Sequence, residues 1–208
     1  MAENPKATVC IGKNDIRGRH YGDRLNIQVE SVFQQTMPSF ELLVDARLRD
    51  EFPEKWKDRE NIRFIEASSL GDFKDSALEQ CRTPYIMFQD GFARLNPKIL
   101  MRHYEALCSC TEKYGFTTSP LTRFDGKHTT EYSFSDLCFN HNMSQTRTKE
   151  GDTTFALDLF FCNKLFRAEH LRGIRFSFSD NNILDMYITD NGCGMTDEQV
   201  KRLDDPFF

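Results

Sequence analysis

Acidic residues close two short apolar segments of this chain, at positions where a parallel sheet presents groups to a ligand. Asp45 ends the segment Phe40 to Asp45 (FELLVD), and Asp90 ends the segment Tyr85 to Asp90 (YIMFQD). Both segments have the length and the apolar character of buried strands. Carboxylates at strand ends can accept hydrogen bonds from a ligand, coordinate a hard cation or take up a proton. Because ligands of open α/β sheets bind outside the carboxyl ends of the strands, the two residues predict a site at that edge.

A set of strands and helices must position these carboxylates. The predicted strands are residues 7–11, 40–45, 61–66 and 85–90. Apolar residues at helical spacing predict crossover helices over 23–35 and 70–82, and a longer helix over 98–114 after Pro97. This alternation predicts an α/β fold, with a central, mainly parallel, Rossmann-like sheet flanked by helices.

Length and composition favour one main domain and exclude a nucleic-acid partner. The chain has 208 residues, of which 39% are hydrophobic, enough for one sizeable core. We expect residues 1–185 to form this domain and residues 186–208 to form a short C-terminal appendage. The formal net charge of −5 argues against nucleic-acid binding, because such surfaces need an excess of Lys and Arg.

The cysteines and the hydropathy indicate where the protein works. The 7 cysteines are scattered with no CxxC pair, which favours reduced thiols over disulfides or a zinc site. No stretch reaches the roughly 18 apolar residues of a membrane span, and the N-terminus lacks the apolar core of a signal peptide. These features predict a cytoplasmic protein and leave peripheral association with a membrane open.

The sequence around Asp45 also carries a family resemblance. The spacing of Ser31, Gln34 and Thr36, followed by a Pro turn, is similar to the SxxxQT motif of family 2 nucleotide-sugar glycosyltransferases. Asp45 matches the first acidic residue of the VDD motif that follows in this family, and Ala46 stands in place of the second. The resemblance implies a GT-A fold and a role for Asp45 in holding the nucleoside.

Other positions resemble nucleotide-binding residues of the same family. Asn14 matches the Asn of the Pro-x-Tyr-Asn turn that often follows the first strand. The stretch from Gly71 to Tyr85 resembles the G-x-x-x-A-R-N-x-G segment, with Lys74 in place of the Arg and Asp75 in place of the Asn. The resemblance thus implies a UDP-sugar as donor, bound by Asn14, Asp45, Lys74, Asp75 and Asp90.

The fourth predicted strand is similar to the LDxDDxxxP motif, whose later carboxylates bind the divalent cation of the donor. The spacing from Asp90 to Pro97 is kept, but Phe92 and Ala93 stand where carboxylates are expected. A hard cation such as Mn²⁺ or Mg²⁺ needs several oxygen ligands. The resemblance therefore implies Asp90 as one metal ligand in a depleted site.

A later part of the chain resembles members of this family that build polysaccharides. Asn163 to Arg167 (NKLFR) and Gly173 to Phe176 (GIRF) match a segment that an acidic catalytic base follows. In this sequence the base would be Asp185. The implied activity is transfer of a sugar from a nucleotide sugar to a saccharide or lipid-linked acceptor, in cell-surface polysaccharide biosynthesis.

Two other interpretations stay open. Ala46, Phe92 and Ala93 replace expected carboxylates, which favours a catalytically silent GT-A-like module that binds or scaffolds. The segment Met186 to Phe208 is similar to the DNGxGM and PFF boxes of histidine-kinase-type ATP-binding domains, where Asp190 would face the adenine. Because the upstream helix with a metal-binding Asn and the glycine-rich lid of that family have no match here, we expect no working ATP site.

Overall fold

The chain forms two compact units. The computed structural model describes residues 4–13, 21–90, 94–110, 115–119, 121–124, 129–132, 163–178 and 184–188. The first unit consists of Met1–Thr118 and Phe161–Ile188, and the second of Ser119–Phe160 and Thr189–Phe208. In the second unit, β6 (Leu121–Phe124) pairs antiparallel with β7 (Thr129–Tyr132).

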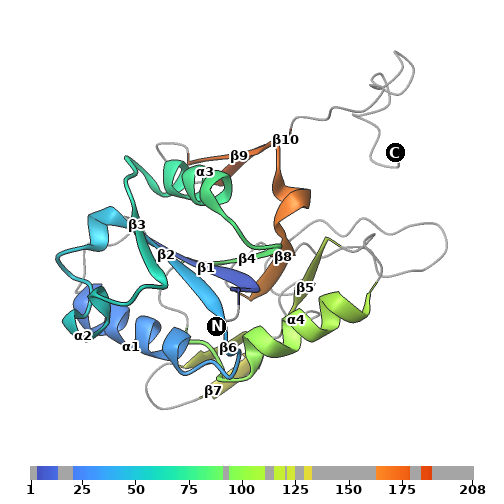
Figure 1. Ribbon diagram of the computed structural model, residues 1–208, viewed down its shortest axis with the longest axis horizontal. Coiled ribbons are helices and arrows are strands. Elements are labelled where there is room, and N and C mark those ends of the chain that lie inside the picture. The colour runs from blue at the N-terminus through green and yellow to red at the C-terminus, as the bar shows by residue number, and fades with distance from the viewer. Residues whose placement is uncertain are drawn as a thin grey trace. The chain divides into compact units, whose positions relative to one another are not determined.

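The first unit alternates strands and helices along most of its length (Figure 1). Its elements are, in chain order, β1 (Ala7–Gly12), α1 (Tyr21–Phe33), β2 (Phe40–Asp45), η1 (Ala46–Leu48), α2 (Glu54–Lys57), β3 (Ile62–Ile65), α3 (Leu70–Gln80), β4 (Tyr85–Asp90), α4 (Ile99–Ser109), β5 (Phe116–Thr118), β8 (Lys164–Arg167), η2 (Ala168–Leu171), β9 (Ile174–Phe178) and β10 (Leu184–Ile188). The predicted strands correspond to β1, β2, β3 and β4, and the predicted helices to α1, α3 and α4. Hydrophobic periodicity therefore located these elements correctly.

A 6-stranded sheet forms the centre of this unit, in the order β3-β2-β1-β4-β8-β5. The strands β1, β2, β3 and β4 are parallel, whereas β8 is antiparallel to both β4 and β5. From β1, the chain adds β2 and β3 on one side and then β4 on the other. The predicted α/β fold with a mainly parallel sheet and flanking helices is confirmed.

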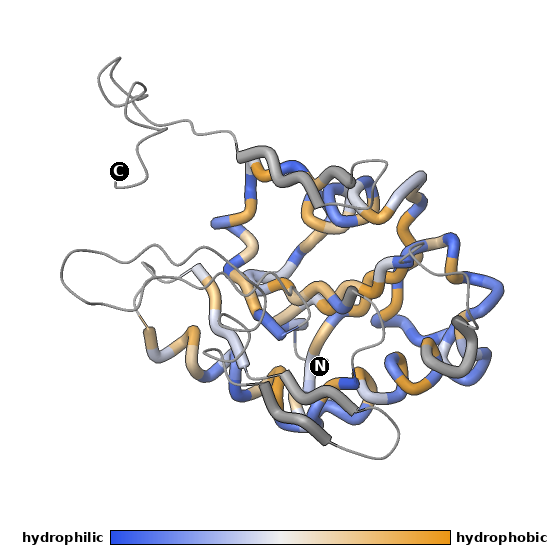
Figure 2. The backbone as a smooth tube through the Cα atoms, turned by 180° about the vertical axis from the view of Figure 1, so that it is seen from behind, coloured by the Kyte–Doolittle hydropathy of each residue, from blue (hydrophilic) through white to orange (hydrophobic). Residues whose placement is uncertain are grey.

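Helices cover both faces of the sheet, because successive strand residues point to opposite faces. One apolar cluster joins the central strands to α1 and α4, and includes Val9, Val44 and Leu100. The other joins them to α3, β8 and η2, and includes Cys10 and Phe73. In Figure 2, hydrophobic colour is concentrated along these central strands. Because both faces of the sheet are packed against helices, the ends of its strands are held in fixed positions. A ligand site at the edge of the sheet requires such fixed positions.

β1 ends at a glycine for a steric reason. A Cβ atom at Gly12 would overlap Leu70 Cδ1 and lie 3.0 Å from Phe73 Cδ1. The missing side chain lets the first turn of α3 approach the end of β1 closely. The chain that leaves β1 therefore begins beside the N-terminus of α3.

Buried polar side chains attach α1 to the segment after β4. Ser31 Oγ accepts a hydrogen bond from Leu95 N at 3.0 Å, and Gln35 Nε2 donates to Asn96 O at 2.9 Å. Gln34, by contrast, is exposed. The glutamine of the SxxxQT-like motif that acts in the fold is therefore Gln35, and the assignment to Gln34 from the sequence was wrong. The motif holds in place the segment that follows β4.

The last described strand crosses the predicted domain boundary. β10 pairs antiparallel with β9, and Asp185 lies opposite Ser177 in this pair. The boundary expected between residues 185 and 186 thus falls inside β10.

The helices of the described residues are short. The longest, α1, has 13 residues. None in this part of the chain is long and apolar enough to cross a membrane.

Candidate functional site

The carboxyl ends of β1, β2 and β4 lie along one edge of the sheet. Gly12 and Asp90 are register partners at the ends of β1 and β4. Asp45 ends β2 next to β1, where Val44 pairs with Ile11. The order of strand addition reverses at β1, so this edge contains the switch point at which open α/β sheets bind ligands. The structure thus brings the backbone positions of Asp45 and Asp90 to one edge.

Asp45 has a fully buried carboxylate at this edge. Its Oδ1 accepts hydrogen bonds from N and Nε of Arg47, both at 3.0 Å. Its Oδ2 accepts from Arg47 Nη2 at 2.6 Å and from Lys13 N at 3.1 Å. Asp45 thereby caps the short 3₁₀ helix η1 and joins the ends of β1 and β2.

Two cations beside Asp45 were missed from the sequence. Arg47 and Lys13 are both partly exposed. Lys13 Nζ donates to Arg47 O at 3.4 Å and lies 3.3 Å from Glu51 Oε1. The spacing of Asp45 and Arg47 was the available signal, because a strand-end Asp commonly bonds to groups two residues further along.

Asp72 adds a charged carboxylate in the first turn of α3. Its Oδ2 accepts hydrogen bonds from Ser68 N at 2.7 Å and from Ser68 Oγ at 2.8 Å. These bonds hold the pKa of Asp72 below its ordinary value, and the positive charge of Arg47 lowers the pKa further. The guanidinium of Arg47 is therefore within electrostatic reach of both β2 and α3.

Lys74, a predicted site residue on α3, is fully buried. Its ammonium lies 5.6 Å from the ring centroid of Phe88 and 5.5 Å from that of Phe176. Phe88 is two residues from the end of β4, so this cation lies close to the carboxyl edge. Burying an ammonium group is costly, and contacts with aromatic rings offset part of the cost. Burial and contact with two aromatic rings distinguish Lys74 from a solvated charge on a helix face.

Asp75, also predicted in the site, attaches β9 to α3. Its Oδ1 accepts a hydrogen bond from Phe176 N at 2.9 Å, and its Oδ2 lies 3.8 Å from Arg175 Nη1. Asp75 therefore fixes the residue whose ring faces the ammonium of Lys74. Within the described residues its contacts are those of a positioning group.

A second buried lysine begins β8. Because β8 runs antiparallel to β4, residues before Phe166 lie toward the carboxyl end of β4. Lys164 is buried, and its Nζ donates to Asn163 Oδ1 at 2.9 Å.

On α4, the ring of His103 is buried with its Nδ1 2.8 Å from Thr117 Oγ1. Burial, and then the charge of Lys164, lower the pKa of His103 to about 4, so the ring is neutral near pH 7.

The remaining predicted residues are described in part or not at all. The backbone of Asp90 ends β4, and the backbone of Asp185 lies in β10. The side chains of both residues and the whole of Asn14 lie outside the described part of the chain. The same holds for Asp190 and the rest of the histidine-kinase-like segment beyond Ile188.

The donor set at the end of β4 does not fit a divalent cation held by the protein alone. Asp90 is followed by Gly91, Phe92 and Ala93, so one carboxylate remains in this stretch. Mg²⁺ requires a near-octahedral set of oxygen ligands, which phosphates and water would then have to complete. Among the residues that the structure describes, no group of three His, Cys, Asp or Glu side chains could hold a metal ion.

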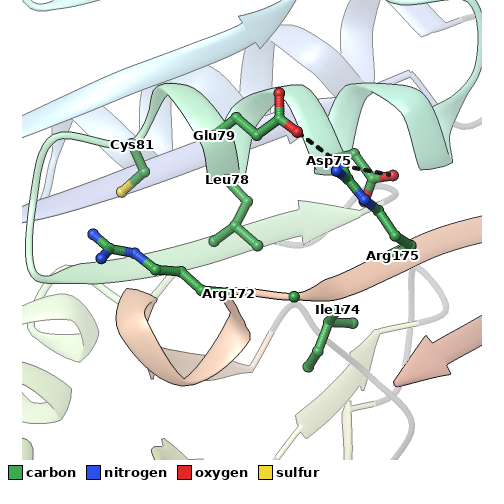
Figure 3. Close-up of a pocket in the computed structure, with 8 residues that line it drawn as sticks. Asp75, Leu78, Glu79, Cys81, Arg172, Ile174 and Arg175 are labelled. Carbon is green, nitrogen blue, oxygen red and sulfur yellow. Dashed lines mark hydrogen bonds and ion pairs between the residues drawn. The ribbon is translucent and has the colours of Figure 1, made fainter. Parts of the chain in front are cut away.

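A cleft of about 320 Å³ lies between α3 and β9 (Figure 3). Figure 3 shows Arg175 pointing toward Asp75 and Glu79, with Arg175 Nη1 2.8 Å from Glu79 Oε1. Cys81, at the end of the cleft, bonds through its Sγ to Thr8 Oγ1 at 3.5 Å, close to the start of β1. The cleft thus extends toward the amino ends of the strands and shares only Asp75 with the predicted site.

The sheet order, the flanking helices and the switch-point edge define a GT-A-like fold. The structure is similar to crystal structures of S. aureus TarS 1-349. The complex with UDP-GlcNAc matches with a TM-score of 0.54 and 16% identity, over 85% of this chain and 51% of that one. The complex with UDP matches with a TM-score of 0.52 and 14% identity, over 83% and 50%. No protein-family model and no curated protein matches the sequence. This likeness shows the fold, and the chain spans about half the length of these TarS structures.

Proposed function

We propose that this chain is a nucleotide-sugar-dependent glycosyltransferase of cell-surface polysaccharide biosynthesis. The observation that carries the proposal is the charge pattern at the switch-point edge, where the buried Asp45 lies beside Lys13 and Arg47, and Lys74 is buried close by. Such an edge suits a nucleoside diphosphate, because polar groups can bind the nucleoside and cations the phosphates. The TarS structures of similar fold contain UDP and UDP-GlcNAc, which supports a UDP-sugar as the donor.

Each predicted residue has a role in this proposal. Asn14 and Asp45 help to bind the nucleoside, Lys74 offsets the negative charge of the diphosphate, and Asp75 holds β9 beside Lys74. Asp185 is the general base that takes the proton of the acceptor hydroxyl group. The acceptor oxygen then bonds to the anomeric carbon of the sugar, as the bond from that carbon to the diphosphate breaks. The acceptor is a saccharide or a lipid-linked saccharide.

Charge neutralisation of the leaving diphosphate falls first to protein side chains. Asp90 is the one protein ligand that we propose for a divalent cation, Mn²⁺ or Mg²⁺, which would arrive with the donor. When bound, such a cation stabilises negative charge on phosphoryl oxygens. Because the donor set does not fit a cation without the diphosphate, we assign the fixed positive charge to Lys74, which is buried and acts on the diphosphate through its charge and not by direct contact.

The proposal extends to organisation and location. Residues 1–185 contain the glycosyltransferase domain, and residues 186–208 form a C-terminal tail whose first residues complete β10. The protein works in the cytoplasm, with peripheral attachment to the membrane that carries lipid-linked acceptors. The net charge of −5 argues against a nucleic-acid partner.

A catalytically silent GT-A-like binding module is the second candidate. It is favoured by Ala46, Phe92 and Ala93, which stand where the resemblance expects carboxylates. The hydrogen bonds that Asp45 accepts from its own chain point the same way. In a silent module, restoring carboxylates with Ala46→Asp, Phe92→Asp and Ala93→Asp would create metal-dependent nucleotide binding.

Calorimetric titration of UDP and UDP-GlcNAc, with Mn²⁺ and separately with EDTA, tests the proposal. We expect binding with a dissociation constant below about 1 mM, and release of UDP from the UDP-sugar when a suitable acceptor is present. Asp185→Asn should keep the affinity and abolish the release of UDP. Asp58→Asn, at an exposed aspartate after α2, is the matched control. If neither nucleotide binds, the enzyme is refuted, and the carboxylate-restoring variants then test the silent module. Binding without any transfer would also favour the silent module.

A further inference from the structure

The cleft between α3 and β9 combines an apolar middle with charged ends. Its volume of about 320 Å³ is at the lower end of the range of small-molecule sites, about 300–1,000 Å³. Leu78 and Ile174 lie between Arg172 at one end and Arg175 at the other (Figure 3). On α3 the lining runs over residues 75–81, which is about 9 Å at the helical rise of about 1.5 Å per residue. These dimensions suit a small molecule with an apolar body.

The walls of the cleft are held by contacts within the chain. Phe176 N donates to Asp75 Oδ1 at 2.9 Å, which ties β9 to α3. Leu171 and Phe176 are both buried, so the wall opposite α3 is anchored before and after the cleft. Between them the chain turns at Gly173 with a φ of 90°, a conformation that glycine adopts readily. The cleft is therefore formed in advance, as is usual for small-molecule sites.

The charges at the two ends of the cleft differ. At one end, Arg175 Nη1 lies 2.8 Å from Glu79 Oε1 and 3.8 Å from Asp75 Oδ2, so two carboxylates share one cation. At the other end, Arg172 is exposed and extends away from Arg175. Within the part of the chain that the structure describes, the guanidinium of Arg172 forms no hydrogen bond or ion pair. Its donors are thus available to a ligand.

We propose that this cleft binds a small organic anion, whose anionic group contacts Arg172 and whose apolar body covers Leu78 and Ile174. The planar guanidinium can donate two parallel hydrogen bonds to a carboxylate or a phosphate group. The carboxylates of Asp75 and Glu79 orient the ligand, because they repel its anionic group from the opposite end. This site is additional to the proposed donor site, with which it shares only Asp75.

NMR titration of the isotope-labelled whole chain tests the site with two probes that join an anion to an apolar ring, benzoate and phenyl phosphate. Both should shift the backbone amide signals of Leu78, Cys81, Gly173 and Ile174, with dissociation constants of about 1–10 mM. Benzamide lacks the negative charge and inorganic phosphate lacks the ring. Each should therefore bind at least about fivefold more weakly than its parent probe. The tighter of the two probes identifies the anionic group that the site prefers.

Two variants at exposed arginines separate the role of Arg172 from a general effect of charge. Arg172→Gln should weaken the binding of both probes about fivefold. Because this side chain is exposed, the stability should stay within about 0.5 kcal/mol. Arg82→Gln is the matched control, since Arg82 is exposed and follows Cys81 in the sequence but does not line the cleft. Its affinities should equal those of the unaltered protein.

Three outcomes would overturn this proposal. The first is that neither probe shifts the signals of the cleft at about 20 mM, far above the expected dissociation constants. The second is that Arg172→Gln binds the probes as tightly as the unaltered protein does. The third is that benzamide binds as tightly as benzoate, or inorganic phosphate as tightly as phenyl phosphate, because the cleft would then not select for both an anion and an apolar body.

Discussion

Two arginine–carboxylate ion pairs have similar N···O distances but differ in their exposure to solvent. Arg47 Nη2 is 2.6 Å from Asp45 Oδ2, and these side chains are 24% and 0% exposed. Arg175 Nη1 is 2.8 Å from Glu79 Oε1, and these side chains are 60% and 64% exposed. Solvent screening and lost side-chain entropy leave an exposed pair little net value, whereas a buried carboxylate depends on its donors. Burial, and not bond length, thus identifies the pair on which the fold relies.

The largest expected effect comes from removing the buried carboxylate. Asp45→Ala deletes the acceptor for Lys13 N and for Arg47, and so releases the contact between the ends of β1 and β2. We expect the free energy of unfolding to fall by about 3–5 kcal/mol, as for other broken buried pairs. Urea denaturation followed by circular dichroism measures the change. A fall in the free energy of unfolding of less than about 1 kcal/mol, as is typical of exposed ion pairs, would contradict this prediction.

His103 extends the comparison to a buried group that stays uncharged. Burial, and then the charge of Lys164, lower its pKa from 6.5 to about 4. Between these pH values the unfolded chain binds a proton that the folded chain does not, so stability should fall as the pH is lowered through this range. The full shift corresponds to a loss of up to about 3 kcal/mol. Above the unfolded pKa the contribution should be constant.

The matched variant for this prediction is His103→Gln, which removes the titrating group. Urea denaturation of both proteins from about pH 8 to about pH 4 isolates the histidine, because the carboxylates titrate in both. The difference in unfolding free energy should change below the unfolded pKa of His103. Parallel curves for the two proteins would contradict the prediction.

A smaller effect is expected where the buried polar group is neutral. Gln35 donates to Asn96 O at 2.9 Å and accepts from Leu100 N at 3.1 Å. Gln35→Ala leaves these backbone groups without their partner, and should lower the unfolding free energy by about 2 kcal/mol. Gln34→Ala, at the exposed neighbour, should stay within about 0.5 kcal/mol. Equal effects at the two positions would restore Gln34 as the motif glutamine.

Most of the fold could be predicted from the sequence, because its elements follow local rules. Each of β1, β2, β3 and β4 is a short apolar run, and α1 and α3 have helical spacing of apolar residues. The carboxyl edge followed from the parallel arrangement, so the placement of Asp45 and Asp90 at one edge could be derived as well.

The environment of each site residue could not be predicted, because it depends on segments far apart in the sequence. The burial of Lys74 depends on Phe176, which β9 brings to α3. The hydrogen bond from Lys13 to Asp45 requires β1 beside β2. Gln34 and Gln35 both follow the end of α1, and Gln35 is buried because it contacts Asn96 O and Leu100 N, which are far away in the sequence.

The smallest effect is expected at the exposed pair beside the cleft of Figure 3. Arg175→Ala removes the contacts with Glu79 and Asp75, which raise the pKa of the Arg175 guanidinium. Because water replaces these contacts at an exposed site, the urea midpoint should not change measurably at low or at high salt. Asp75→Ala is the informative neighbour, since it also deletes the acceptor of Phe176 N at 2.9 Å and should lower the midpoint. If Arg175→Ala proved as destabilising as Asp45→Ala, burial would not be the property that separates the two pairs.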